Sequence, residues 1–453
     1  MALLPLLISC LLASAQTADN FYWYKDSVVY QLYVRSFQDT NGDGIGDLKG
    51  VIQHADYLKS LGIGAVWLSP IYPSPNYDYG YDIADMENVN PEYGTLEDFN
   101  ELVKEMKARG IRVIMDFVPN HTSIKHGWFL ASEARNDTDE AYSEFYIWKD
   151  PSGYDGNNKP LPPNNWLSVM GTGSAWQWSE KRKQFYLHSF LVEQADLNYD
   201  NPIVRKKMNN VLKLWMNRGV SGFRMDAVSW IYDDLACGNE PTSDHPNPNN
   251  PNDYGNHDQH RFPSRFSDEW VDVLHMMVMT LPGTVLTYNG DEIGLEDAYV
   301  RYDEGKDLQG LRAGPSRFAA MSRDFERGPM PWKAAKNGGF STGRPWLPLA
   351  PSLWSRNVEN EASEENKRSH LHVYKKLVQL RKTKTMTEGS CLVQTSDEGL
   401  LIITRVLRDN PTTLTVLNLG DFEITADLTT FRRSLPSSLG IVVSSYNFPA
   451  TEK

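Results

Sequence analysis

Short apolar segments alternate with amphipathic helical segments along most of this chain. The apolar runs that predict strands lie at residues 27–34, 65–68, 112–117, 220–226 and 283–288. Stretches with helical periodicity lie between or after them, at residues 48–61, 95–109, 202–218 and 370–382. This alternation is typical of βαβ units, so we expect an α/β fold with a parallel sheet covered by helices.

Two parts of the chain break this rhythm. Residues 118–198 are rich in Pro, Trp and Asn, which predicts an inserted lobe. From residue 387 onwards, alternating apolar and polar positions predict a small antiparallel β-structure. We therefore expect a main domain formed by residues 16–117 and 199–386, a lobe at 118–198 and a C-terminal β domain at 387–453.

Composition narrows the range of partners. The net charge of −13 over 453 residues argues against nucleic acid and against anionic membrane surfaces. The chain is also rich in aromatic residues, with 13 Trp, 22 Tyr and 17 Phe. Because sugar rings stack on aromatic rings, this composition suits a carbohydrate site, although on composition alone a large aromatic core is the favoured explanation.

The N-terminal residues 1–15 have the pattern of a secretory signal peptide. An apolar stretch at residues 3–12 precedes Ala13, Ser14 and Ala15, which form a small-residue cleavage signal. This stretch is too short to span a membrane, and no later run reaches the roughly 18 apolar residues that a span requires. We therefore expect a secreted, extracellular protein without a transmembrane segment.

Signal cleavage would leave two cysteines, Cys237 and Cys391, which are too few for a disulfide framework. Whether these two pair is left open by the sequence. Asn136 begins an acceptable N-glycosylation sequon in a polar stretch, so a glycoprotein is expected.

Polar side chains gather where the third and fourth predicted strands end. Asp116, Asn120 and His121 follow one strand, and Arg224 and Asp226 end the next. In a barrel of eight β/α units, chemistry is carried at the carboxyl ends of the strands. A single aspartate at a strand end is more often a structural ion-pair partner, so these positions need support from further motifs.

Several ordered motifs provide that support. Asp116–His121, Gly222–Asp226 and Asn256–Asp258 resemble three well-known segments of the α-amylase family, glycoside hydrolase family 13, and Gln194–Asn198 resembles a fourth, lobe-borne segment. Within the family, Tyr79–Asp82, Thr287–Gly290 and Ser322–Asp324 resemble α-glucosidases, in particular secreted insect maltases and oligo-1,6-glucosidases. The resemblance implies a (β/α)8 TIM-type barrel.

The resemblance also implies an activity and the residues that perform it. The expected reaction is retaining hydrolysis of terminal α-1,4-linked glucose from maltose, sucrose or short oligosaccharides. Asp226 would be the nucleophile, and Asp258 would stabilise the oxocarbenium-like transition state. Substrate-binding roles fall to Asp78, Tyr81, His121, Arg224, His257 and Arg327. The residues that follow Arg327 differ from the family pattern, because Gly328 and Pro331 replace the usual Thr and Gln.

An acidic loop near the N-terminus predicts a structural Ca²⁺ site. Oxygen-bearing side chains at alternate positions, with glycines that allow a tight turn, suit a hard cation. By resemblance to oligo-1,6-glucosidases, the ligands would be Asp39, Asn41, Asp43, the Ile45 carbonyl and Asp47. A metal-free loop of Asx turns is the alternative.

The chain has almost no room for the general acid/base glutamate that the family carries on the fifth barrel strand. Only 30 residues separate Asp226 from His257, whereas three β/α units need roughly 90. Residues 236–255 are rich in Pro and Asn and contain no apolar run. We therefore expect an incomplete barrel that lacks two to three units after the fourth strand.

The missing glutamate leaves two functional hypotheses. The first is an α-glucosidase that is active only weakly or through a substitute acid, for which the candidates are Glu240, Asp244, Asp253 and Glu292. The second is a catalytically impaired pseudoenzyme or sugar-binding protein.

Overall fold

The computed structural model describes residues 22–135, 142–171, 173–232, 238–239, 256–363, 365, 368–433, 435–436 and 438–448. Several expectations lie outside these residues: the signal peptide at 1–15, the sequon at Asn136, Cys237, and the candidate acids Glu240, Asp244 and Asp253.

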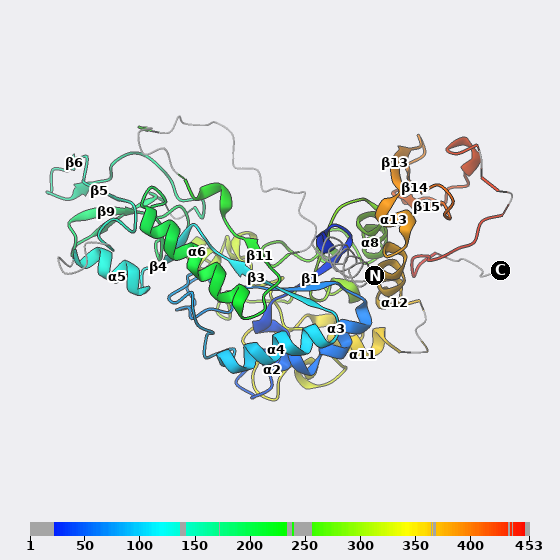
Figure 1. Cartoon of the computed structure of the whole chain (residues 1–453), viewed down its shortest axis with the longest axis horizontal. Coiled ribbons are helices and arrows are strands. Elements are labelled where there is room, and N and C mark those ends of the chain that lie inside the picture. The colour runs from blue at the N-terminus through cyan, green and yellow to red at the C-terminus, as the bar shows by residue number, and fades with distance from the viewer. Residues whose placement is uncertain are drawn as a thin grey trace, which may run out of the picture.

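A five-stranded parallel sheet forms the centre of the molecule (Figure 1). Its strands are β1 (Val28–Leu32), β2 (Ala65–Leu68), β3 (Arg112–Phe117), β11 (Gly222–Met225) and β12 (Val285–Tyr288). The order across the sheet is β11-β3-β2-β1-β12, and all four pairings are parallel. Every apolar run that predicted a strand in the main domain therefore forms one, and the expected parallel α/β fold is confirmed.

Burial falls from the middle of this sheet to its edges. All residues of β1 and β2 are buried, because helices and loops cover both faces of the central strands. At the edges, Met225 of β11 is 43% exposed and Leu286 of β12 is 52% exposed. Within the described residues, β11 and β12 each pair on one side only, so the sheet has two open edges.

Helices cover the sheet. They are α2 (Leu48–Gln53), α3 (Ala55–Leu61), α4 (Leu96–Ala108), α6 (Pro202–Asn217), α8 (Trp270–Thr280) and α12 (His370–Arg381). Thr95 and Asp98 form a capping box at the start of α4, and Asn201 caps α6 ahead of Pro202. The single helix expected at residues 48–61 is divided at His54 into α2 and α3.

Shorter helices complete the main domain. They are α7 (Phe262–Arg265), α9 (Leu308–Ala313), α10 (Phe318–Met321), α11 (Val358–Glu361) and α13 (Lys384–Glu388). Among the described residues, no helix is both long and apolar enough to cross a bilayer.

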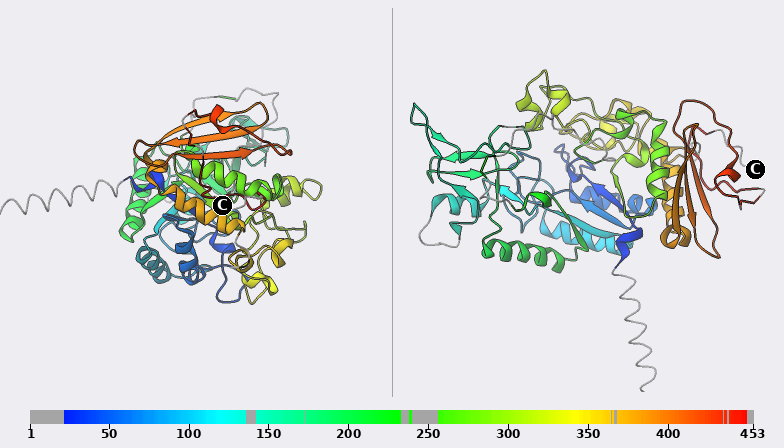
Figure 2. Two further views of the ribbon diagram at one scale, coloured as in Figure 1. Left: turned by 90° about the vertical axis from the view of Figure 1, so that its right-hand side faces the viewer. Right: turned by 90° about the horizontal axis from the view of Figure 1, so that it is seen from above.

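Small antiparallel elements lie at the two ends of the molecule (Figure 2). One end carries α5 (Gly127–Ala134), β4 (His121–Ser123), β5 (Trp148–Lys149), β6 (Gly153–Tyr154), β7 (Pro160–Leu161), β8 (Trp176–Ser179), β9 (Gln184–Leu187) and β10 (Gln194–Asp196). The opposite end carries the expected C-terminal antiparallel sheet of β13 (Ser390–Thr395), β14 (Leu400–Val406) and β15 (Thr413–Asn418). Arg405 of β14 joins this sheet to α8 by donating to the Thr280 carbonyl at 2.9 Å.

Candidate active site

The carboxyl ends of β3 and β11 bring Asp116, Arg224 and Asp226 together. β3 and β11 run in register, with Arg224 opposite Asp116, and the backbone N–H of Asp226 donates to the Phe117 carbonyl at 2.9 Å. Arg224 Nη1 bridges the two carboxylates, at 3.2 Å from Asp116 Oδ1 and in a short contact with Asp226 Oδ1. The guanidinium also lies over the Trp67 ring at 5.0 Å, which fixes its plane.

Asp116 is an anchor within this group. It is 1% exposed, and its Oδ2 accepts from the Tyr81 hydroxyl at 2.9 Å and from Trp67 Nε1 at 3.2 Å. Burial raises the pKa of Asp116 to about 7, against the opposing charge of Arg224. Through these contacts, Asp116 holds Arg224 and Tyr81 in place.

Asp226 is the more accessible carboxylate, with a side chain that is 18% exposed. Burial raises the pKa of Asp226, and the guanidinium of Arg224 opposes this rise. Asp258 and Asp78 also raise this pKa through their negative charge, so the three carboxylates belong to one electrostatic site. An aspartate that Arg224 orients and partly neutralises is chemically suited to attack an electrophilic carbon.

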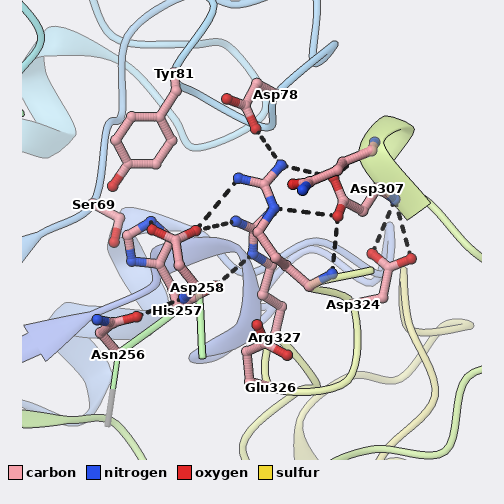
Figure 3. A network of polar contacts seen from close by, with 12 residues as sticks. Ser69, Asp78, Tyr81, Asn256, His257, Asp258, Asp307, Asp324, Glu326 and Arg327 are labelled. Atoms are coloured by element: carbon pink, nitrogen blue, oxygen red, sulfur yellow. Dashed lines mark hydrogen bonds and ion pairs between the residues drawn. The ribbon is translucent and has the colours of Figure 1, made fainter. Parts of the chain in front are cut away.

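Asp258 lies in a cationic environment (Figure 3). Its Oδ1 accepts from Arg327 Nη2 at 2.8 Å and lies 3.4 Å from Arg323 Nη1. Although burial opposes ionisation, these two guanidinium groups hold the pKa of Asp258 well below its usual range. Arg327 also donates through Nε to the His257 carbonyl at 2.8 Å, so one side chain fixes the backbone and the carboxylate together.

His257 stacks on two aromatic rings. It stacks on Tyr81, with ring centroids 5.2 Å apart and planes 3° apart, and on Tyr33 at 5.8 Å. With the Gln31 amide oriented as it is, Nδ1 accepts from Gln31 Nε2 at 2.7 Å, so the proton lies on Nε2, 3.4 Å from Asp258. Burial lowers the pKa of His257 to about 3, which keeps the ring neutral.

Arg323 and Asp307 were missed by sequence reasoning as members of the site. Arg323 Nη2 contacts Asp78 Oδ1 at 2.8 Å and Asp307 Oδ1 at 2.7 Å, and Nη1 reaches Asp258. Gln194, from β10, donates to the other oxygen of Asp78 at 3.0 Å. The only sequence signal for Arg323 is the Ser-Arg-Asp motif at 322–324, which resembles α-glucosidases but does not itself indicate a role for the arginine.

His121 is brought to the same region, where both of its ring nitrogens have protein partners. It is 1% exposed; Nε2 lies 3.2 Å from the Tyr81 carbonyl, and Nδ1 lies 3.2 Å from Asn120 Nδ2. This geometry positions the Tyr81 backbone. Direct contact of His121 with a sugar hydroxyl stays a prediction.

Glu292 is the one candidate substitute acid that the structure describes, and its contacts lie in the core. Its Oε1 accepts from the hydroxyls of Tyr30 at 2.8 Å and Tyr57 at 2.7 Å, and Oε2 accepts from the Gly290 N–H. It is 0% exposed, and none of these partners belongs to the site around Asp226. Glu292 is therefore unsuited to protonate a leaving group there.

In the acidic loop at residues 39–47, the side chains accept hydrogen bonds from the loop's own backbone. Asp39 accepts from Asn41, Gly42 and Gly44 N–H groups, and Asp43 accepts from Ile45 N–H at 2.8 Å. Gly42 and Gly44 have φ of +86° and +93°, which glycine adopts without strain. Asp47 caps α2 through the Gly50 N–H. The loop fits Asx turns and supplies hard oxygen atoms, so calcium binding stays a prediction.

Comparison with known proteins identifies the family that this chain resembles. The model of the α-amylase catalytic domain matches residues 31–254 and 244–389, two segments that meet at 244–254. Maltase 1 of Drosophila virilis is 36% identical, with 94% of this chain and 83% of the relative covered. The salivary α-glucosidase of Aedes aegypti is 34% identical, with 97% and 93% covered. Trehalose-6-phosphate hydrolase of Escherichia coli is 34% identical, with 80% and 84% covered.

Solved structures of other proteins also superpose on this chain. An α-glucosyl transfer enzyme superposes with a TM-score of 0.79 at 30% identity, covering 88% of this chain and 91% of its own. An isomaltulose synthase mutant from Erwinia rhapontici, in complex with sucrose, superposes with a TM-score of 0.78 at 30% identity, with the same coverage.

The alignment to the Drosophila virilis maltase also measures what this chain lacks. It spans 531 positions, whereas 94% of 453 residues is about 426 residues. About 105 positions of the alignment, the difference between these lengths, therefore face no residue of this chain. The motifs, the parallel sheet and these comparisons agree: the chain belongs to the α-amylase family of glycoside hydrolases, family 13, in its α-glucosidase and maltase group.

Proposed function

We propose that this chain acts on the terminal α-1,4-linked glucose of maltose, sucrose or short oligosaccharides by a retaining mechanism. The observation that carries this proposal is the paired contact of Arg224 with Asp116 and Asp226, next to Asp258 held by Arg327. It supplies one oriented nucleophile and one strongly ionised carboxylate in one electrostatic site. The names of the maltase and α-glucosidase relatives support the substrate class.

In this mechanism, Asp226 attacks the anomeric carbon while the bond to the leaving oxygen breaks, giving a covalent glucosyl ester. Asp258 stabilises the positive charge that develops on the sugar ring, because its pKa is held low and it stays ionised. Water then attacks the same carbon and releases Asp226. Asp78, Tyr81, His257 and Arg327 would define the glucose pocket, and His121 would support it from behind Tyr81.

The leaving oxygen must also gain a proton, and no described residue near Asp226 is placed to donate it. General acid catalysis is typically worth about 10²–10⁴-fold in rate. A second candidate function is therefore a catalytically impaired enzyme or a sugar-binding protein on the same scaffold. The observation that favours it is the core-facing position of Glu292.

We infer that three β/α units of the barrel are absent, which accounts for the missing acid. Three observations support this inference. β12 pairs with β1, the place of the last strand in a closed barrel, and β11 ends the other edge as the fourth strand. The two segments of the family match meet at residues 244–254. The roughly 105 unmatched positions are close to three units of roughly 30 residues.

The remaining organisation follows the same proposal. The truncated barrel would comprise residues 16–117 and 199–386 and lack its units between about 236 and 255, with the lobe at 118–198 and the C-terminal domain at 387–453. Secretion is supported by the pattern of residues 1–15 and by relatives named as salivary α-glucosidases. The loop of Asp39, Asn41, Asp43, Ile45 and Asp47 would hold a structural Ca²⁺.

The test compares substrates that differ in how much the leaving group needs a proton. Maltose needs protonation, whereas α-glucosyl fluoride and p-nitrophenyl α-glucoside do not. We expect turnover of the activated substrates, abolished by Asp226→Asn, with maltose slower by about 10²–10⁴-fold than α-glucosyl fluoride. Azide should accelerate turnover and give α-glucosyl azide, because two inversions at carbon preserve the configuration.

Each other outcome decides between the candidates. Equal turnover of maltose and the activated substrates would mean that a substitute acid exists. The proposal of a catalytically impaired enzyme would then be wrong. If a folded chain turns over none of these substrates yet binds glucose, the sugar-binding candidate stands and the enzymatic proposal fails.

A further inference from the structure

A second cluster of ionisable side chains lies on the segments that carry Asp258 and Arg327 and on a third segment around residue 297. It consists of His260, Asp297 and Glu326, and one ligand atom from each lies within 4.8 Å of the other two. His260 Nδ1 is 2.7 Å from Asp297 Oδ2 and 3.9 Å from Glu326 Oε2. Neither the proposed mechanism nor the acidic loop uses these residues.

Glu326 shows that this cluster differs from an ordinary ion pair. Its side chain is 2% exposed, and Oε2 has no hydrogen-bond partner among the described residues. A buried carboxylate oxygen without a hydrogen bond is costly in free energy, so such an atom is usually satisfied by a proton or an ion. Oε2 is also the atom that faces His260, so it is directed into the cluster.

A similar set of residues elsewhere in the chain provides a contrast. His370 also contacts two carboxylates, with Nδ1 at 2.8 Å from Asp272 and Nε2 at 3.2 Å from Asp268. These carboxylates lie at opposite nitrogens of the ring, so they cannot bind one ion together. In the cluster around His260, both carboxylates approach the same nitrogen, which is the arrangement that a shared ion requires.

We propose that His260 Nδ1, Asp297 and Glu326 bind a divalent transition-metal ion of the Zn²⁺ type. An imidazole nitrogen with two carboxylates suits Zn²⁺, whereas Ca²⁺ and Mg²⁺ prefer oxygen ligands alone. Two carboxylates and a neutral imidazole balance the charge of the ion. The ring of His260 is 41% exposed, so ion and water can enter from solvent.

The groups behind the ligands also support a built site. The Arg261 N–H donates to Asp297 Oδ1 at 2.7 Å, which leaves Oδ2 directed at His260. The Asp297 N–H is held by Ser264 Oγ at 2.8 Å. Such contacts orient a carboxylate ligand before the ion arrives.

The ion would be structural and would act close to the active site. His260 lies two residues after Asp258, and Glu326 directly precedes Arg327, whose guanidinium binds Asp258 at 2.8 Å. An ion that joins His260 to Glu326 therefore fastens the two segments that hold this pair. We expect binding to raise the thermal unfolding temperature of the full chain.

The experiment titrates the EDTA-treated full chain with Zn²⁺ by calorimetry and with Co²⁺ by visible absorption. Glu326→Gln keeps the shape of the side chain and should weaken Zn²⁺ binding by at least about tenfold. It should also abolish the Zn²⁺-dependent rise in unfolding temperature, while the ion-free variant unfolds no earlier than wild type. Asp268→Asn, at the contrasting cluster, should leave the Zn²⁺ affinity unchanged.

Three results would overturn the proposal. They are no Zn²⁺ binding by the folded chain at 100-fold molar excess, affinity that Glu326→Gln and His260→Gln leave unaltered, or equal weakening by Asp268→Asn. None of these readouts depends on turnover, so the outcome is independent of the proposed α-glucosidase activity.

Discussion

The hydroxyl of Tyr81 donates to Asp116 at 2.9 Å while its ring lies parallel to that of His257, with planes 3° apart. The Tyr81 side chain thus connects Asp116, which holds Arg224, to His257, which directly precedes Asp258. The two halves of the site come from segments far apart in the sequence, and Tyr81 is in contact with both. Its hydroxyl and its ring can be tested separately.

Tyr81→Phe removes the hydroxyl and keeps the stacked ring. We expect a loss of about 1–3 kcal/mol in the free energy of unfolding, because a buried oxygen of Asp116 loses a donor. Tyr33→Phe is the matched control: Tyr33 also stacks on His257, and its buried hydroxyl has no partner among the described residues. Urea unfolding of both variants should separate them, and equal losses would contradict this role of Tyr81.

Arg323 should be among the residues least tolerant of substitution. Its guanidinium contacts Asp78, Asp307 and Asp258, and its side chain is 14% exposed. Arg323→Met would leave buried carboxylates without a counter-charge, which typically costs about 3–5 kcal/mol. Arg323→Lys keeps the charge but cannot span three carboxylates, so we expect a smaller loss of stability together with a weaker affinity for glucose.

Arg301 offers a comparison for this result. It pairs with Asp303 at 2.8 Å, but both side chains are more than half exposed. Exposed pairs contribute about 0–1 kcal/mol, so Arg301→Lys should change neither unfolding in urea nor glucose affinity. If Arg323→Lys behaved like Arg301→Lys in both measurements, the contacts of Arg323 with its three carboxylates would contribute neither to stability nor to glucose affinity.

The stability of the chain should fall in mildly alkaline solution because of His370. Burial disfavours its charged form, but hydrogen bonds to Asp268 and Asp272 raise the pKa of His370 to about 9. A group with a raised pKa stabilises the fold fully below its unfolded value of about 6.5 and loses this contribution as pH rises towards 9. The shift corresponds to about 3 kcal/mol.

The measurement is the free energy of unfolding between pH 6 and pH 10. His370→Gln should lower stability at pH 6 and flatten the decline between pH 6.5 and 9. Asp268→Asn should reduce the decline without removing it, because Asp272 remains in contact. A decline of the same size in His370→Gln as in wild type would mean that another group is responsible.

The sequence predicted the strands well because their signal is local. Each apolar run of the main sheet became a strand, and motif residues such as Asp226 and Asp258 came together as expected. The break between α2 and α3 could not be predicted, since residues 48–61 have continuous helical periodicity. It occurs at His54, whose ring stacks on Trp332 with centroids 3.5 Å apart. That partner lies 278 positions away in the chain, so no local pattern contains it.

The role of Arg323 was hidden for the same reason. An arginine in a Ser-Arg-Asp motif has no local feature that shows it will meet Asp78 and Asp307. The position of Glu292 was also hidden, because a glutamate just after a strand end can face the site or the core. Here the hydroxyls of Tyr30 and Tyr57, brought by β1 and α3, hold it in the core.

Calcium should stabilise the chain through the acidic loop of residues 39–47. Asp39 joins this loop to Ser341 by a hydrogen bond of 2.6 Å, so ordering the loop would also fix the segment around Ser341. An ion that binds only the folded chain stabilises it by about 2.7 kcal/mol at 100 times its dissociation constant. Thermal unfolding after EDTA treatment should therefore shift to higher temperature when Ca²⁺ is added.

Asp43→Ala should weaken this response without affecting the response to Zn²⁺, because Asp43 lies outside the cluster of His260, Asp297 and Glu326. An unfolding temperature that does not respond to Ca²⁺ in wild type would leave the loop as a set of Asx turns, in which the carboxylates accept hydrogen bonds from protein donors alone, such as the nearby backbone N–H groups and the Ser341 hydroxyl.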